Sequence, residues 1–169
     1  MKIIFLDIDG VLNSEQFFDK ITDKDREYFR NLDYSKDENL LKLQMLDVDK
    51  DKADLVSEIA YMTGAQVVIT SSWKSLRIFP LVVRELLRYG IPVIGSTPNM
   101  ENRRGEEIRT YLKEHPEVKK YAILDDEIFG DYNELMDHLV KTNFFNNGLE
   151  SYHVNQIVNL LGKKEDDPK

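Results

Sequence analysis

The hydrophobic positions of this chain gather in short runs, and most of the runs stop at glycine, hydroxyl or acidic residues. Runs of this length that are rich in branched residues are typical of strands buried on both faces of a parallel sheet. The predicted strands cover residues 3–6, 66–69, 91–95 and 121–124, with a weaker candidate at 138–142.

Helical patterns separate these runs. Apolar residues recur at helical spacing within 55–60, 80–89 and 108–112, and a last helix is expected from about residue 151 to Gly162. A strand, a helix and a second parallel strand are joined by a right-handed crossover. The order therefore predicts an α/β fold: a doubly wound, Rossmann-like parallel sheet of about five strands with helices on both faces.

Residues from about 13 to 50, inserted after the first strand, show little sustained periodicity and mix charges with aromatic residues. A structureless loop of this length is uncommon in a compact domain. We expect either a partly helical, functional excursion or a solvated surface segment. Since no linker divides the chain, residues 1–169 are expected to form a single domain, with a frayed tail at 163–169.

Composition narrows the class of protein. The 169 residues, 41% of them hydrophobic, suffice for one domain with a real core. The absence of cysteine excludes disulfides and thiolate metal sites. With no leader-like segment or membrane-length apolar run, we expect a soluble, cytoplasmic protein. A net charge of -8 argues against a broad electrostatic footprint on nucleic acid, although a local basic pocket is still compatible with it.

Four acids follow two of the predicted strands. Asp7 and Asp9 come after the first strand, before Gly10, while Asp125 and Asp126 come after the fourth. The carboxyl ends of parallel strands share one edge of the sheet, where ligands of α/β proteins bind. Clustered carboxylates raise one another's pKa unless a cation neutralises them, and oxygen ligands suit a hard ion. The acids therefore predict a Mg²⁺ site at this edge.

The sequence around the acids resembles a known family. The segment Asp7-Ile8-Asp9-Gly10-Val11-Leu12 is similar to the first motif of the haloacid dehalogenase-like (HAD) phosphohydrolases, and the other three motifs follow in the family's order. The resemblance implies that Asp7 is a nucleophile that becomes an aspartyl-phosphate. It implies that Asp9 is the general acid and base.

The second and third family motifs supply a hydroxyl and a cation. The hydroxyl that closes the second strand is expected to be Ser71, with Thr70 as the alternative if the register differs by one. The cation is expected to be Arg104, with its neighbour Arg103 as the alternative. Without the family, strand-end hydroxyls simply cap the next helix and paired arginines are solvated charges.

The fourth motif completes the site that the resemblance implies. Mg²⁺ would be held by Asp7, the backbone carbonyl of Asp9 and Asp126, with Asp125 orienting metal-bound waters or serving as the alternate ligand. The substrate phosphate would be bound by Ser71, Arg104 and the backbone N–H of Ile8. Further substrate contacts are expected from Ser72, Lys74 and Arg103.

Other features resemble a narrower group, the compact HAD domains associated with RNA-repair proteins. They are Ser71-Ser72-Trp73, a Thr-Pro before the arginines, and a Gly-Leu before the last helix. In the superfamily, the insertion at about 13–50 corresponds to a flap or short cap. The implied reaction is hydrolysis of a phosphomonoester, either a nucleotide or another small phosphorylated substrate, or a nucleic-acid terminal phosphate.

Two alternatives come from other classes of protein. A response-regulator receiver also combines acids, a hydroxyl, a basic residue and Mg²⁺, but in another order, and here no lone aspartate closes the strand at Ile94. A catalytically silent domain would bind a phosphorylated partner without turnover. The sequence leaves the oligomeric state open.

One acidic pattern imitates a calcium site. Asp47, Asp49, Asp51 and Glu58 match positions 1, 3, 5 and 12 of an EF-hand loop, but the sixth position, normally glycine, is Lys52. The same segment has helical periodicity with acids near its start and a glycine after its end. We therefore predict an amphipathic helix here instead of calcium binding.

Overall fold

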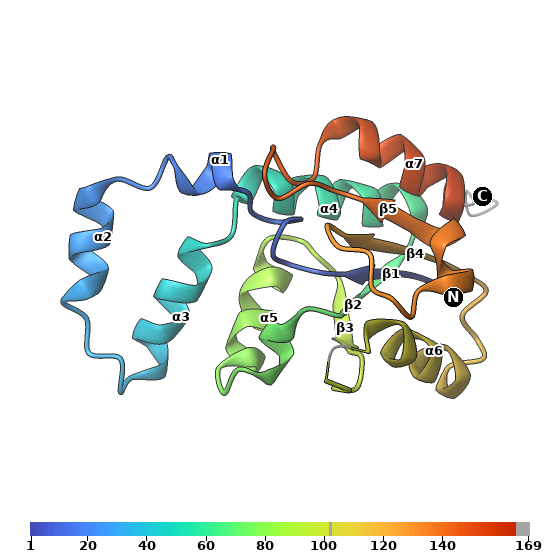
Figure 1. The fold of residues 1–169 in the computed structure, drawn as a ribbon, viewed down its shortest axis with the longest axis horizontal. Helices are drawn as coiled ribbons and strands as arrows, with labels where there is room; N and C mark the ends of the chain where they lie inside the picture. Colours follow the sequence, from blue (N-terminus) through green and yellow to red (C-terminus); the bar gives the residue numbers. More distant parts are fainter. Residues whose placement is uncertain (102, 165–169) are drawn as a thin grey trace, which may run out of the picture.

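The computed structural model describes residues 1–101 and 103–164, and a five-stranded sheet organises them (Figure 1). All strand pairs are parallel, and the spatial order is β3-β2-β1-β4-β5. The predicted five-stranded, Rossmann-like α/β fold is confirmed. The strands are β1 (Lys2–Leu6), β2 (Gln66–Ile69), β3 (Val93–Ser96), β4 (Lys120–Asp125) and β5 (Leu139–Lys141). Of the expected tail, residues 165–169 lie outside the described part of the chain.

Helices cover both faces of the sheet because its central strand is apolar on both sides. Ile4 and Leu6 of β1 pack in the cluster formed with three helices, while Ile3 and Phe5 face the cluster on the other side. The first face carries α4 (Lys50–Thr63), α5 (Phe79–Arg88) and α7 (Ser151–Leu161). The second carries α6 (Arg104–Glu114) and the 3-10 helix η2 (Asn133–His138).

The direction of winding reverses between β1 and β4. The chain moves outward from β1 to β2 and β3, then returns to place β4 on the other side of β1. Ligands of open α/β sheets bind at such a switch point, outside the carboxyl ends of the strands. Receivers have the strand order 2-1-3-4-5, so the receiver alternative is wrong.

Backbone hydrogen bonds continue one residue beyond the strand ladders. Asp7, Thr70, Thr97 and Thr142 each donate their N–H to the end of a neighbouring strand, at 2.9 to 3.0 Å. These residues therefore form a polar row along the carboxyl edge, and the row shares the rigidity of the sheet.

The insertion after β1 is helical. It contains α1 (Glu15–Phe18), α2 (Asp23–Arg30) and α3 (Asp37–Leu46), which form an arch beside the sheet domain (Figure 1). Thr22 and Asp25 form a capping box at the start of α2. The arch is tied to the body where Arg77 binds Asp37 at 3.1 Å and donates to the carbonyl of Tyr34.

The acidic pattern that imitates an EF-hand is the start of α4. Asp49 caps this helix by accepting the N–H of Asp51 at 3.0 Å, and Gly64 ends it with a φ of +68°. Helical backbone from Lys50 onward cannot wrap around a calcium ion, so the helix prediction is correct. In the described ranges, no helix is both long and apolar enough to cross a membrane.

Candidate active site

A cavity of about 500 Å³ opens at the carboxyl edge of the sheet, at the switch point. It brings together most of the site residues predicted from the sequence, and several aromatic side chains complete its wall. The predicted residues that line it are Asp7, Asp9, Thr70, Ser72, Lys74, Arg104 and Asp126. The aromatic residues that line it are Phe129, Phe144 and Phe145.

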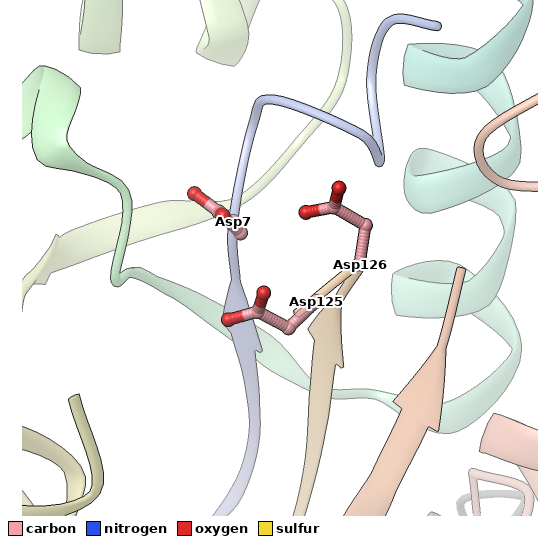
Figure 2. Close-up of side chains that lie close together, drawn as sticks. All are labelled: Asp7, Asp125 and Asp126. Atoms are coloured by element: carbon pink, nitrogen blue, oxygen red, sulfur yellow. The ribbon is translucent and has the colours of Figure 1, made fainter. Parts of the chain in front are cut away.

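Three carboxylates converge at the base of this cavity. Asp7 comes from the end of β1, and Asp125 and Asp126 from the end of the adjacent β4 (Figure 2). One carboxylate oxygen of each lies within 4.8 Å of those of the other two. A set of oxygen ligands with this spacing fits a hard divalent cation such as Mg²⁺.

Gly10 makes this convergence possible. Its φ is +71°, and a Cβ atom added to it would lie 2.1 Å from Cγ of Asp126. Any side chain at this position would therefore clash with the acid as well as strain the backbone. The loop after β1 and the end of β4 can approach each other only because residue 10 is glycine.

Asp125 is the acid whose charge the chain itself neutralises. Its side chain is fully buried, and its Oδ2 accepts from Arg104 and from the Tyr132 hydroxyl, both at 2.8 Å. Its Oδ1 accepts the backbone N–H of Glu127 at 3.0 Å. Burial and the nearby Asp7 raise the pKa of Asp125 to about 6, although these donors oppose the rise. Its partners leave Asp125 little freedom to act on a ligand directly.

Arg104 links the two strand ends. The same Nη1 atom lies 2.8 Å from Asp7 Oδ2 and 2.8 Å from Asp125 Oδ2. Its guanidinium lies 4.6 Å from the ring centroid of Phe129, within cation–π range. Its neighbour Arg103 is exposed and outside the cavity wall. The geometry thus favours Arg104 over Arg103 as the cation of the site.

The first turn of α6 does not offer its backbone amides to the cavity. Asp131 accepts from the N–H groups of Gly105 and Glu106 at 3.1 and 2.9 Å. A Cβ atom on Gly105 would lie 2.3 Å from the carbonyl oxygen of Asp131. An anion in the cavity would therefore be attracted by the Arg104 side chain instead of the start of the helix.

Asp126 is the open acid of the cluster. It is half-buried and lines the cavity, and no side chain of the described residues donates to it. Burial, followed by repulsion from Asp125 and Asp7, raises the pKa of Asp126 to about 6. A bound cation would remove this repulsion, which is why the cluster suits a metal ion.

Asp9 is exposed at the mouth of the cavity and is held by neutral donors. Its Oδ2 accepts from the indole Nε1 of Trp73 at 2.9 Å, and its Oδ1 accepts from Nδ2 of Asn13 at 2.9 Å. The backbone N–H of Gly10 fixes this orientation of Asn13 through its Oδ1 at 2.8 Å. At the end of α3, burial and the negative charge of Asp9 raise the pKa of Asp47 to about 6.

The hydroxyl in the cavity belongs to Thr70 instead of Ser71. The Thr70 Oγ1 is fully buried and has no hydrogen-bond partner among residues 1–101 and 103–164, and Thr70 lines the cavity beside Asp7. The Ser71 hydroxyl is buried elsewhere and accepts the N–H of Trp73. The geometry thus favours Thr70, the alternative that differs by one residue, over Ser71. β2 ends at Ile69, so Thr70 is the first residue beyond it.

Two more predicted residues have partners that limit their role. Lys74 lines the cavity, but its Nζ is 2.5 Å from Glu107, 3.0 Å from Thr97 Oγ1 and 3.2 Å from the carbonyl oxygen of Thr70. Burial lowers the pKa of Lys74. The backbone N–H of Ile8 donates to Asp7 Oδ1 at 2.9 Å. Lys74 therefore supports the backbone at Thr70. The third predicted substrate contact, Ser72, is exposed on the cavity wall.

The sequence interpretation missed four residues that position these groups. They are Asn13, Trp73, Glu107 and Tyr132. Trp73, the only tryptophan of the chain, follows the strand-end hydroxyls, and this local signal could have identified it. Glu107 and Tyr132 reach the site only through the packing of α6 and the segment before η2, so no local pattern marks them.

Comparison with known families agrees with this geometry. Residues 3–154 match the family described as "HAD domain in Swiss Army Knife RNA repair proteins". The match spans β1 to the beginning of α7 and includes every residue of the cavity wall. No curated protein and no solved structure matches the chain.

Proposed function

Because this chain belongs to the family of HAD domains in Swiss Army Knife RNA repair proteins, we propose that it is a Mg²⁺-dependent phosphomonoester hydrolase that forms an aspartyl-phosphate. One observation carries the proposal: Asp7, Asp125 and Asp126 converge at the switch point with Arg104 beside them. A nucleophilic carboxylate, a cation site and a phosphate-binding arginine are the parts that phosphoryl transfer to an acid needs.

In the first step, a carboxylate oxygen of Asp7 forms a bond to phosphorus. The bond from phosphorus to the ester oxygen breaks, and that oxygen takes a proton from Asp9 as it leaves. The dephosphorylated alcohol departs and Asp7 carries the phosphoryl group. Asp9 suits this role because it lies two residues from Asp7, exposed in the same cavity.

In the second step, a water molecule attacks the phosphorus of the aspartyl-phosphate. Asp9, now a carboxylate, accepts the proton of that water, and the bond from phosphorus to the Asp7 oxygen breaks. Inorganic phosphate leaves, and both acids return to their initial protonation states. Asn13 and Trp73 keep the Asp9 carboxylate oriented between the steps.

Asp7 and Asp126 would hold the Mg²⁺ ion, with Asp125 supporting them from its buried position. When bound, the ion supplies positive charge that reduces repulsion between the phosphate and the carboxylates. Arg104 and the buried hydroxyl of Thr70 would bind phosphate oxygens. Lys74 and Glu107 would keep Thr70 in place.

The terminal phosphate of RNA, or a nucleotide derived from it, is the proposed substrate class. The description of the family supports it, because it places these HAD domains in RNA repair proteins. A phosphate at the end of an RNA strand can enter the cavity without the rest of the strand passing through it. The net charge of -8 disfavours long contacts with a phosphate backbone, so recognition should centre on the end itself.

The test is turnover of an aryl phosphate by the purified chain. Hydrolysis is expected with Mg²⁺ and should stop when EDTA removes the ion. Calcium should inhibit, because its looser coordination allows a bidentate carboxylate and misplaces the nucleophile. Full activity after exhaustive chelation would remove the metal from the proposal. Phosphate binding without any turnover would support the silent-domain alternative.

A further inference from the structure

An exposed aromatic side chain stands at the rim of the candidate active site. Phe145 is 76% exposed, and together with Phe144 it lines the same cavity as Asp7 and Asp126. Proteins that bind single-stranded RNA stack its unpaired bases on aromatic side chains such as phenylalanine. We propose that Phe144 and Phe145 form a stacking platform for the nucleobases next to a terminal phosphate. This inference rests on the proposed function and adds to it a binding site for bases.

The platform is fixed to the catalytic loop. At one end of its turn the Thr142 hydroxyl donates to the carbonyl of Gly10 at 2.7 Å, and at the other the Leu149 N–H donates to the carbonyl of Val11 at 3.1 Å. In the middle, the Phe144 carbonyl accepts the N–H of Glu15 at 2.9 Å. The backbone that carries the exposed ring is therefore held at a defined place relative to the loop after β1.

The turn itself is tightly built. Gly148 adopts a φ of +60°, and a Cβ atom there would lie 2.7 Å from the carbonyl oxygen of Asn13. Asn143 accepts the N–H of Phe145 through its Oδ1 at 3.0 Å, and its carbonyl accepts the N–H of Gly148 at 3.0 Å. A rigid platform loses little conformational entropy when a base stacks on it.

The platform continues into the insertion as a row of rings. Centroids are 5.4 Å apart for Phe144 and Phe145, 6.1 Å for Phe18 and Phe144, and 5.9 Å for Phe17 and Phe18. Phe18 also lines a second cavity of about 500 Å³ inside the arch. That cavity is lined by Phe29 and Tyr34 together with Arg26 and Arg30. The row is longer than one base, which favours a short single strand over a mononucleotide.

The net charge of the chain favours single-stranded over double-stranded nucleic acid as the ligand. A chain of net charge -8 gains little from the phosphates of a duplex, whereas stacking uses base faces that only a single strand exposes. The ligand class that fits is therefore the last one to three nucleotides of a single-stranded RNA whose terminal phosphate enters the cavity.

The experiment measures the affinity of a labelled single-stranded RNA pentamer with a terminal phosphate, placed on the 3' or the 5' end in separate arms. Its abasic counterpart, which has the same phosphates without bases, is the comparison ligand. Stacking contributes about 1 to 3 kcal/mol per base, so the abasic strand should bind about 5- to 150-fold more weakly. Phe145→Ala should cause a loss of similar size for the natural strand, while Phe145→Trp should retain binding.

The control is Tyr61→Ala, which removes a ring that is 83% exposed on α4 and outside the cavity wall. Its affinity for both strands should equal that of the wild type. Equal binding of natural and abasic strands, or no effect of Phe145→Ala, would overturn the platform. So would tighter binding of a phosphopeptide than of the RNA. If the hydrolase proposal fails instead, the wild type turns over no phosphomonoester while the difference between the two strands remains measurable.

Discussion

The acids after β1 and the acids after β4 share one cavity, but the chain holds their charges differently. At the end of β4, Asp125 is buried and faces the cation Arg104 and the hydroxyl of Tyr132. At the mouth, Asp9 is exposed and faces the indole N–H of Trp73 and the amide of Asn13, which are both neutral. Asp7 lies between the two and shares Arg104 with Asp125.

This difference separates two ways of holding a carboxylate. Asp125 is buried and accepts from Arg104 and from Tyr132, so its side chain has one fixed orientation. Asp9 is exposed, and its two neutral donors fix its orientation while leaving it open to a ligand in the cavity. The chain thus fixes Asp125 beside the place where a metal ion would bind and leaves the proposed acid and base accessible at the mouth of the cavity.

The largest effect should come from Asp7→Asn. An amide is not a nucleophile for phosphorus, so turnover of every phosphomonoester should disappear. The acid-stable, hydroxylamine-sensitive phosphoprotein formed by the wild type should disappear as well. Acid quenching with labelled substrate measures this directly. Labelled phosphoenzyme that persists in the variant would place the nucleophile elsewhere.

The next effect is expected from Asp9→Asn, which removes the proton donor while keeping the size of the side chain. General acid and base groups contribute about 10²- to 10⁴-fold, so kcat should fall by that order. The loss should be smaller for an aryl phosphate, whose leaving oxygen barely needs a proton, than for an alkyl phosphate. Asp137→Asn, at an exposed acid in η2, is the control. Equal losses on both substrates would show that Asp9 does not transfer the proton.

A smaller effect, on stability, should follow Tyr132→Phe. The change deletes a buried hydrogen bond of 2.8 Å to Asp125, and hydrogen bonds to charged groups contribute about 1.5 to 3 kcal/mol. The free energy of unfolding from urea titration should fall by that amount. Tyr61→Phe removes the same hydroxyl from an exposed ring and should change nothing. Equal stabilities for the two variants would mean that the Tyr132 hydroxyl contributes nothing to holding Asp125, which would then depend on Arg104 and the Glu127 N–H.

The smallest effect is the contribution of Asp126 to the pH dependence of stability. Its pKa in the folded chain is about 6 against an ordinary value of 3.8, so the folded state holds the proton more tightly than the unfolded state. Metal-free protein should therefore lose stability as pH rises from about 4 to about 6. Because the group is half-exposed, we expect about 1 kcal/mol or less from it, or about 2 to 4 °C in Tm.

Asp126→Asn should reduce this pH dependence, and saturating Mg²⁺ should remove it from the wild type but not from the variant. Thermal unfolding between pH 4 and pH 7.5, with and without the ion, measures both. A Mg²⁺-induced rise in Tm that is the same in the variant would exclude Asp126 as a ligand.

The sheet and its acids were predictable because both rest on local sequence. Short apolar runs located the first four strands and a weaker pattern at 138–142 located the fifth, and the acids that follow two of the strands fell at the predicted edge. The order of the motifs also identified the family. Helix ends were less exact: α4 begins after Asp49, and α5 begins one residue before Pro80.

The contacts that tune the site were not predictable, because they join segments far apart in the sequence. Trp73 lies 64 residues from Asp9, and Lys74 lies 33 residues from Glu107. The choice between Thr70 and Ser71 depends on where β2 ends, and the apolar run alone does not fix that point to one residue. In the insertion, α1 has only four residues and α3 has a weak apolar period, whereas α2 is amphipathic and begins with the Thr22–Asp25 capping box that was present in the sequence.

Gly10 offers a way to recognise related chains that have lost this chemistry. A Cβ atom at this position would overlap Asp126, so a relative with any other residue there must move its acid after β4 out of the cluster. Such a relative could keep both aspartates of the first motif and still lack the complete cation site. Residue 10 therefore indicates, from the relative's sequence alone, whether the acid after β4 can join the cluster.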